Sequence, residues 1–245
     1  MSGADGADGA DDPLVSQATL LAAPSPVAAR CCGLDEVGRG ALAGPLVAAA
    51  VIVPADIHER LGALAPFLRD SKATPRGKRE AVARALREHA LLIALAIAPV
   101  SQINALGVGW ANREVFRRLI SEVDADDYVV DGKVRPPAPA DRIARVRCLV
   151  KADAHTPAVS AASIVAKVYR DHLMAELARA HSGYGWERNA GYGSAEHLAA
   201  LRALGPSPHH RTLFVQTALG GGQRAKRTGV RGAAEAAESD DPQLF

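Results

Sequence analysis

Apolar residues are gathered along the chain into short runs that end in turn-forming or acidic residues. Runs over 31–35, 46–53 and 91–98 predict three strands near the start of the chain. Pro54 and Pro99 close the second and third runs. The turn-rich segment GRGALAG joins the first two runs, so we expect these two strands to form a hairpin-like pair.

Helical patterns separate and follow the remaining apolar runs. Thr74 as N-cap and Pro75 at the first helical position predict a helix that runs to about His89. An apolar stripe predicts a helix over 101–120, and Thr156-Pro157 opens a long one to about Ala180, with many small residues in its first half. A further helix fits 194–204, before Gly205-Pro206.

Two more short apolar runs, at 128–130 and 145–150, predict strands that alternate with these helices. Three early strands followed by strand–helix alternation favour an α/β fold: a mixed central sheet flanked by helices, with a C-terminal helical segment. We expect one domain over 28–217. The Gly-rich or charged ends, 1–27 and 218–245, predict disordered tails because they cannot bury enough apolar surface to fold alone.

Charge and composition narrow the class of protein. The 245-residue chain carries a net charge of +2 and its N-terminal tail four acids and no bases, so the rest carries +6 and permits a polyanionic partner. No apolar run approaches the ~20 residues of a membrane-spanning helix, and the N-terminus lacks the pattern of a signal peptide. The three cysteines, Cys31, Cys32 and Cys148, have no metal-binding spacing, so we expect a reduced, cytoplasmic protein.

Three aspartates each follow a predicted strand: Asp35, Asp131 and Asp153, with Glu36 beside the first. Sites in open α/β sheets gather at such strand ends. Four carboxylates in one place need a compensating cation, and an all-oxygen ligand set predicts Mg²⁺ or Mn²⁺. Each acid alone could equally be a solvated cap or a turn former, as Asp131-Gly132 illustrates.

Successive residues of a strand point to opposite faces of its sheet. Asp35 and Glu36 can therefore share one site only if the chain turns at Glu36 or the longer glutamate reaches around the edge. We expect a bend at Glu36.

Several other segments could contact a ligand. Gly38-Arg39-Gly40 can bring backbone N–H groups close to a phosphate or a sugar hydroxyl, and Asp70-Ser71-Lys72 offers a hydroxyl and an ammonium. A plain tight turn and a solvated loop are the alternatives. Lys167 and Arg170 share a helix face, where they could instead form surface salt bridges.

Residues near the end of the expected domain are also candidates. Tyr192, between two glycines, could stack on a sugar or a base, or simply cover the edge of the sheet. His209, His210 and Arg211 could approach the metal or the substrate, or cap the fold.

These segments together resemble bacterial ribonuclease HII, the type 2 ribonuclease H family. The matching stretches run in family order through almost all of 30–214: GLDEVGRGALAGPLVAAAVI (33–52), DSK (70–72), INALGVGWAN (103–112), VVDGK (129–133), VKADA (150–154), VSAASIVAKVYRDHLM (159–174), GYGSAEHLAAL (191–201) and GPSPHHRTLF (205–214).

The resemblance implies an RNase H-like fold, cleavage of the RNA strand of RNA–DNA hybrids and incision at single ribonucleotides in duplex DNA. It places the four catalytic and metal-binding carboxylates at Asp35, Glu36, Asp131 and Asp153. It places recognition of the ribose 2′-hydroxyl at Gly38, Arg39 and Gly40, a phosphate contact at Lys72 and sugar stacking at Tyr192. The chain departs from the commoner family pattern at Val37, Lys133, Ala152 and 188–190.

The expected mechanism uses two Mg²⁺ or Mn²⁺ ions held by the four carboxylates, one activating water and the other stabilising the leaving 3′-oxygen. Cleavage 5′ of a ribonucleotide would leave 3′-hydroxyl and 5′-phosphate ends, and we expect a monomer. Two alternatives remain: a DNA nuclease, resolvase or integrase of the same fold, and a catalytically silent nucleic-acid-binding module.

Overall fold

A single mixed sheet organises the chain in a computed structural model that describes residues 17–20, 30–68 and 71–220. The six strands of the described residues lie in the order β1-β4-β3-β2-β5-β6. Their bounds are β1 Gln17–Leu20, β2 Cys31–Val37, β3 Leu46–Ile52, β4 Leu92–Ala98, β5 Asp127–Asp131 and β6 Val146–Leu149.

The pairing of the strands confirms the expected mixed α/β fold. β1, β4, β3 and β2 pair antiparallel, whereas β2, β5 and β6 pair parallel. The hairpin of β2 and β3 is confirmed. On its other side β2 pairs with β5 only as far as Leu34, opposite Val130. The last residues of β2 therefore extend past this partner, at the edge where β5 ends.

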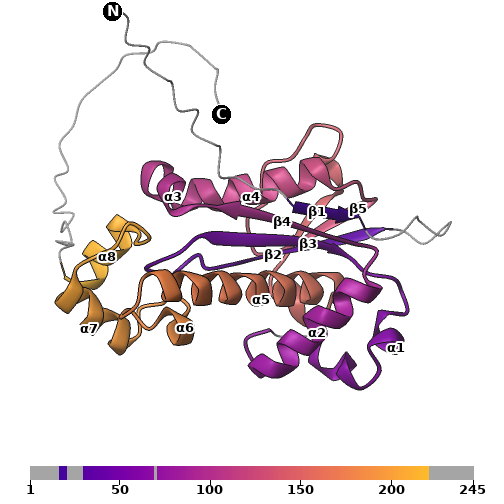
Figure 1. Cartoon of the computed structure of the whole chain (residues 1–245). Coiled ribbons are helices and arrows are strands. Elements are labelled where there is room, and N and C mark those ends of the chain that lie inside the picture. Colours follow the sequence, from indigo (N-terminus) through magenta and orange to yellow (C-terminus); the bar gives the residue numbers. More distant parts are fainter. Residues whose placement is uncertain (1–16, 21–29, 69–70, 221–245) are drawn as a thin grey trace, which may run out of the picture.

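Helices cover both faces of the sheet, and Figure 1 shows α3 and α4 on one side and α1, α2 and α5 on the other. The helical segments are α1 Ile57–Leu61, η1 Gly62–Phe67, α2 Arg76–His89, α3 Val100–Leu106, α4 Val108–Glu122, η2 Ile143–Arg145, η3 Ala152–Ala154, α5 Pro157–Ala180, α6 Trp186–Asn189, α7 Ala195–Leu204 and α8 Thr212–Ala218.

Two apolar cores follow from this alternation of faces. Leu34, Ala48 and Ala50 pack with Phe116 and Leu119 of α4 on one face. On the other face, Val47, Ala49 and Val51 pack with Leu86 of α2 and Ile164 of α5. Since both faces of β3 are covered, all seven of its residues are buried, which explains why its sequence is apolar throughout rather than alternating.

Helix α5 lies close against β2. A Cβ built on Gly33 would stand 2.1–2.4 Å from backbone atoms of Ala158 and Val159 at the start of α5. Only glycine fits there, since real Cβ atoms do not approach other atoms so closely. The small residues at the start of α5 allow this contact, which fixes the helix against the strand that carries Asp35 and Glu36.

The C-terminal helices form a third apolar cluster beyond the end of the sheet. Trp186, Leu201 and Val215 pack there with Leu42 and Met174, the last from α5. Leu42 belongs to the loop between β2 and β3, so this cluster connects the expected C-terminal helical segment to the loop that follows the acids (Figure 1).

The structure corrects several expectations about individual elements. The helix expected over 101–120 is two helices, because Gly107 adopts a φ of +86° and ends α3 before α4 begins. Thr74 does not cap α2: its hydroxyl bonds to the carbonyl of Phe67, and Pro75 precedes the first helical residue, Arg76.

The expected tails are largely outside the described residues. The exception at the N-terminus is β1, a strand inside the range 1–27 that was expected to be disordered; it pairs with β4, which would otherwise form the edge of the sheet. Residues 1–16, 21–29 and 221–245 lie outside the described part of the chain, so the domain limits at 28 and 217 stay predictions.

Candidate active site

The four predicted carboxylates line one cavity of about 620 Å³ at the edge of the sheet where β2 and β5 end. The structure therefore brings Asp35, Glu36, Asp131 and Asp153 together. Polar and basic side chains complete the lining, and they are Arg39, Ser71, Lys72, Arg79, Ser163, Lys167 and Tyr192.

Asp35 lies on the face of β2 that packs against α5. One oxygen of its carboxylate accepts a hydrogen bond from the backbone N–H of Glu36 at 2.8 Å. Burial raises the pKa of Asp35 to about 7, whereas a hydrogen bond to Ser163 lowers it and the charges of Glu36 and Asp131 raise it. The carboxylate is thus held in place by α5 but is electrostatically costly in its charged form.

Glu36 follows on the opposite face of the strand, and the expected bend at this residue is wrong. The antiparallel register with β3 continues unbroken from Cys32 to Val37, and the turn begins only at Gly38. Glu36 still lines the same cavity, because it lies past the last β2–β5 pair at the open edge. Burial raises the pKa of Glu36, Arg39 and Lys72 lower it, and Asp131 raises it.

Asp131 and Asp153 are placed by different elements. Asp131 is the last residue of β5, as predicted, and one of its oxygens accepts a hydrogen bond from the N–H of Ala152 at 2.9 Å. Asp153 does not lie at a strand end. β6 ends at Leu149, Lys151 adopts a left-handed conformation with a φ of +58°, and Asp153 follows on the short helix η3.

The donor chemistry of the cavity fits a hard divalent cation, because its four acids offer only carboxylate oxygens. In the described residues, however, no group of three or more His, Cys, Asp or Glu side chains is arranged to hold a metal ion as it stands. Burial, and to a lesser degree the neighbouring acids, raise the pKa values of Asp35 and Glu36 and make their charged forms costly here. The acids share a cavity without forming a closed coordination cage.

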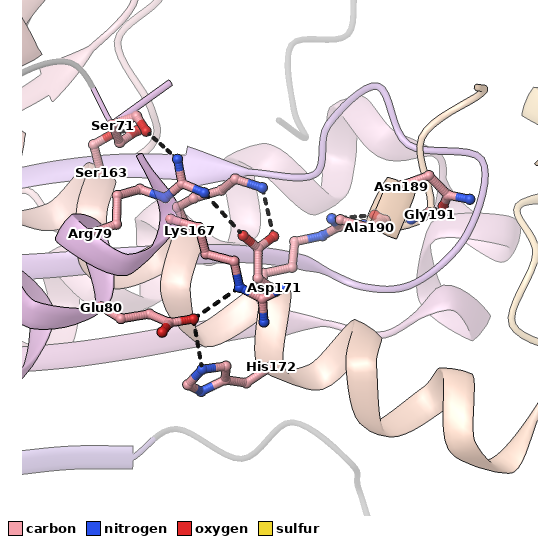
Figure 2. A network of polar contacts seen from close by, with 12 residues as sticks. Ser71, Arg79, Glu80, Ser163, Lys167, Asp171, His172, Asn189, Ala190 and Gly191 are labelled. Atoms are coloured by element: carbon pink, nitrogen blue, oxygen red, sulfur yellow. Dashed lines mark hydrogen bonds and ion pairs between the residues drawn. The ribbon is translucent and has the colours of Figure 1, made fainter. Parts of the chain in front are cut away.

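Basic groups on α2 and α5 enter the same cavity in a fixed arrangement (Figure 2). Lys167 donates to Asp171 at 2.6 Å, and Arg79 lies 3.7 Å from the other oxygen of Asp171. Arg79 also donates to the carbonyl of Ser71, whose hydroxyl lies 2.7 Å from that of Ser163. Lys72, next to Ser71, is exposed and lines the cavity, while Asp70 lies outside the described residues.

The Gly38–Gly40 segment begins the loop between β2 and β3, and two buried arginines hold this loop. Arg170 of α5 donates to the carbonyls of Ala43, Pro45 and Ala190. Gly38 has a φ of +91°, and a Cβ there would meet the guanidinium of Arg170 at 2.2 Å. A glycine is thus required by both the backbone conformation and the close contact.

Arg211, from the PHHR segment, is the second of these arginines. It donates to the carbonyls of Gly44 and Arg39. Both guanidinium groups are completely buried. Burial lowers the pKa of Arg170 and lowers that of Arg211 to about 9. Backbone carbonyls are the acceptors of every hydrogen bond found for the two guanidinium groups in the described part of the chain.

Tyr192 lines the cavity from a loop that buried side chains also hold in place. Its ring lies over the guanidinium of Arg170, 5.4 Å from the centroid to the carbon. Its carbonyl accepts a hydrogen bond from Nδ1 of the buried His197 at 2.9 Å. The residue is 36% exposed, and it lines the cavity, where a ligand can reach it.

A chain of neutral histidines continues behind Tyr192. The N–H of Ser207 donates to Nδ1 of His210, so the proton of His210 is on Nε2, which lies 3.1 Å from Nε2 of His197. Trp186 donates to the same nitrogen of His197, which leaves Nδ1–H of His197 to donate to Tyr192. Burial lowers the pKa of both histidines, to about 4 for His210. His210 therefore supports the Tyr192 loop and does not line the acidic cavity.

Sequence reasoning missed the roles of Ser163, Arg170, Arg211 and His197. Lys167 and Arg170 were expected to share one face, but the first lines the cavity and the second is buried beneath the loop. A buried arginine whose partners are backbone carbonyls leaves no charge pattern that a sequence could reveal. The best available signal was the position of each arginine inside a stretch with other candidate residues.

The cavity, its strand-end acids and its glycine loop coincide with a known family. A family model for ribonuclease HII matches residues 32–217. The chain belongs to the ribonuclease HII family. It is 44% identical over 194 residues to the ribonuclease HII of Paramagnetospirillum magneticum, covering 76% of this chain and 90% of the relative.

Solved structures show the same RNase H-like fold. The ribonuclease H2 of Pyrococcus horikoshii has a TM-score of 0.62 at 24% identity and covers 77% of this chain and 96% of its own. Bst-RNase HIII, solved in complex with Mn²⁺, has a TM-score of 0.57 at 22% identity, with coverages of 78% and 69%.

Membership of the ribonuclease HII family makes the chain an endoribonuclease of the ribonuclease H class. The acidic cavity brings carboxylates, basic groups and the partly exposed Tyr192 together. Among the described helices, none combines the length and apolar character needed to cross a membrane.

Proposed function

We propose that this ribonuclease HII family member hydrolyses the RNA strand of RNA–DNA hybrids and incises duplex DNA 5′ of single embedded ribonucleotides. Products would carry 3′-hydroxyl and 5′-phosphate ends, as ribonucleotide removal during DNA replication and repair requires. One observation supports this most directly: the four carboxylates line the same cavity as Arg39, Lys72 and Tyr192. Hydrolytic groups and groups suited to a sugar–phosphate backbone thus share a single site.

Asp35, Glu36, Asp131 and Asp153 would hold Mn²⁺ or Mg²⁺, two ions per site. Divalent ions in such a site supply an activated water and stabilise the charge of the leaving oxygen. The Mn²⁺ complex of Bst-RNase HIII supports this choice of cofactor. Ser163 would keep Asp35 oriented, and Ala152 would keep Asp131 oriented, through the hydrogen bonds described above.

Recognition would fall to the two loops that meet over Arg170. Gly38, Arg39 and Gly40 begin directly after the acids, so a ribose held at the cavity would present its 2′-hydroxyl to their backbone. Tyr192 would stack on the neighbouring sugar, with Arg170 fixing the height of its ring. Lys72 would bind a phosphate on the α2 side of the cavity.

The enzyme would act as a monomer, since the proposed site uses residues that a single chain can supply. Cys31, Cys32 and Cys148 are all free thiols, which supports action in the reducing cytoplasm.

A cleavage assay tests this proposal against its alternatives. The full chain would be incubated with Mn²⁺ or Mg²⁺ and three labelled duplexes: an RNA–DNA hybrid, a DNA duplex with one ribonucleotide, and an all-DNA duplex. Cleavage of the first two with 3′-hydroxyl ends is the expected result. Cutting of all three would indicate a general nuclease of the same fold, and binding without cutting a silent module.

A further inference from the structure

A second cavity of about 550 Å³ adjoins the first on the α4 side of the sheet. Glu36, Arg39, Asp131 and Gly132 line both cavities, so the two are adjacent at the catalytic acids. The wall of the second comes from α4, from the 132–136 segment after β5 and from 150–151 after β6. This second cavity is called the α4 groove below.

Basic side chains dominate the α4 groove. Beyond the shared Arg39, it is lined by Arg113, Lys133, Arg135 and Lys151, and its only acids are the shared Glu36 and Asp131. All four of these additional cations are exposed. They come from three separate segments of the chain, so the positive charge is spread along the groove rather than focused on one point.

None of these four cations has a side-chain hydrogen bond or ion pair within the described residues. Arginines elsewhere on the surface are mostly paired: Arg60 with Asp56, and Arg147 with Asp127. Helix α4 itself shows the contrast, because Arg117 pairs with Glu114, whereas Arg113, one turn earlier, does not. Four exposed cations without such a partner thus line one groove beside the acids.

Apolar side chains also line the α4 groove. They include Phe116, Val130, Pro136 and Val134, of which Val134 is 77% exposed. The lining of the groove therefore combines exposed cations with apolar side chains.

We propose that the α4 groove binds the phosphodiester backbone of the nucleic-acid duplex beside the nucleotide that is cut. Arg113, Lys133 and Arg135 would contact successive phosphates on the side of the sheet opposite Lys72. The identity of the duplex rests on the proposed function, whereas the binding of a polyanionic backbone rests on the unpaired cations alone. The substrate would then be held on both sides of the carboxylates rather than on one.

The test compares two triple variants of the full chain with equal loss of charge. Arg113→Ala/Lys133→Ala/Arg135→Ala removes cations of the groove, and Arg60→Ala/Arg117→Ala/Arg147→Ala removes paired cations elsewhere. Binding of a fluorescent duplex with one ribonucleotide is measured by anisotropy in EDTA, and kcat/KM is measured with Mn²⁺, each from 50 to 200 mM KCl.

Loss of three phosphate contacts should make the groove variant's affinity less sensitive to salt. Each contact contributes about −0.9 to the slope of log affinity against log salt, so the parent should lose about 40-fold more affinity than the variant over this fourfold salt range. The control variant should keep the parental slope. A groove variant with the parental slope, or a control that changes equally, would overturn the proposal.

A third variant separates charge from shape. Arg113→Lys/Lys133→Arg/Arg135→Lys preserves all three cations and should keep the parental salt slope, and a loss equal to that of the alanine variant would contradict a phosphate contact.

Shortening the duplex on one side of the ribonucleotide should remove the difference in affinity between the parent and the alanine variant for one of the two ends. A difference that persists for both ends would mean diffuse attraction and no groove contact. If the parent does not cut, the proposed function fails, while the anisotropy slopes still decide the groove.

Discussion

The two halves of the active site are stabilised in opposite ways. The acidic half crowds carboxylates together, and burial and like charge raise the pKa values of Asp35 and Glu36. The half proposed for recognition, called the recognition half, is made of the Gly38–Gly40 loop and Tyr192 and lies on buried groups whose hydrogen bonds are satisfied. Arg170 and Arg211 donate to loop carbonyls, and His197 donates to Tyr192.

The two halves differ because binding a sugar and binding cations place different requirements on the protein. A surface that recognises a sugar has to be preorganised before the substrate binds, so the buried groups beneath it form all their hydrogen bonds within the protein. A set of acids that binds cations has to leave its charge uncompensated by the protein, at a cost in stability. The substitutions below should therefore affect catalysis in the first half and both folding and recognition in the second.

The largest effect is expected from Asp35→Asn. This change keeps the size of the side chain and removes one charged oxygen from the acidic half. Cleavage should fall by about 10³-fold or more, because metal-ion stabilisation of a transition state is worth several kcal/mol. Single-turnover cleavage with Mn²⁺ measures this, and duplex affinity should hardly change. Asp127→Asn, at the other end of the parallel strands, is the matched control. Full activity in Asp35→Asn would show that Asp35 does not take part in catalysis.

Arg170→Lys should mainly destabilise the fold. One ammonium cannot reach the carbonyls of both the 43–45 and the 190 segments, so about two buried acceptors lose their donor. Each costs about 1–3 kcal/mol, which predicts a loss of about 2–6 kcal/mol of unfolding free energy. Urea denaturation measures it, with Arg202→Lys on the exposed side of α7 as control. Unchanged stability would mean that Arg170 does not support the two loops.

Tyr192→Ala should reduce incision at single ribonucleotides. Stacking on an aromatic ring is worth about 1–3 kcal/mol per base, which corresponds to about 5- to 150-fold in rate. Tyr192→Phe keeps the ring over Arg170 and should stay close to the parent. Equal rates for the alanine and phenylalanine variants on the single-ribonucleotide duplex would show that the ring does not contact the substrate.

The smallest effect is a pH dependence of stability that comes from the histidines behind Tyr192. An unfolded histidine binds its proton near pH 6.5, whereas folded His210 resists protonation down to about pH 4. The contribution of neutral His210 to the free energy of unfolding is therefore complete above pH 6.5, and it is lost as the pH falls toward 4. Urea denaturation at pH 7.5 and 5 measures this loss. His210→Asn should show a smaller loss, and an equal loss would assign the effect to other groups.

The sequence predicts the acidic half better than the recognition half. Asp35, Asp131 and Asp153 follow apolar runs, and strand ends of a mixed sheet converge, so these acids and Glu36 were placed together, as the cavity confirms. Asp153 reaches the cavity by another route, since Lys151 turns left-handed and a short helix follows. No local pattern indicates that turn, because a lysine rarely adopts this conformation.

The supports of the recognition half depend on tertiary contacts. Arg170 bonds to carbonyls more than a hundred positions earlier in the chain, and the same is true of Arg211. Carbonyls are present at every residue, so no residue type marks the partner. Likewise, the bend expected at Glu36 ignored a property that only the sheet order reveals: β5 ends early enough for both faces of β2 to open on one edge.

Helix α5 has a further consequence for where the chain is cut. The same rigid helix contacts Asp35 through Ser163 and the recognition loops through Arg170. These two residues of α5 are seven positions apart, about 10 Å at 1.5 Å per residue. Under the proposed function, α5 therefore holds the acids and the recognition loops at a fixed separation, and this separation determines which phosphate is cut relative to the sugar that is recognised.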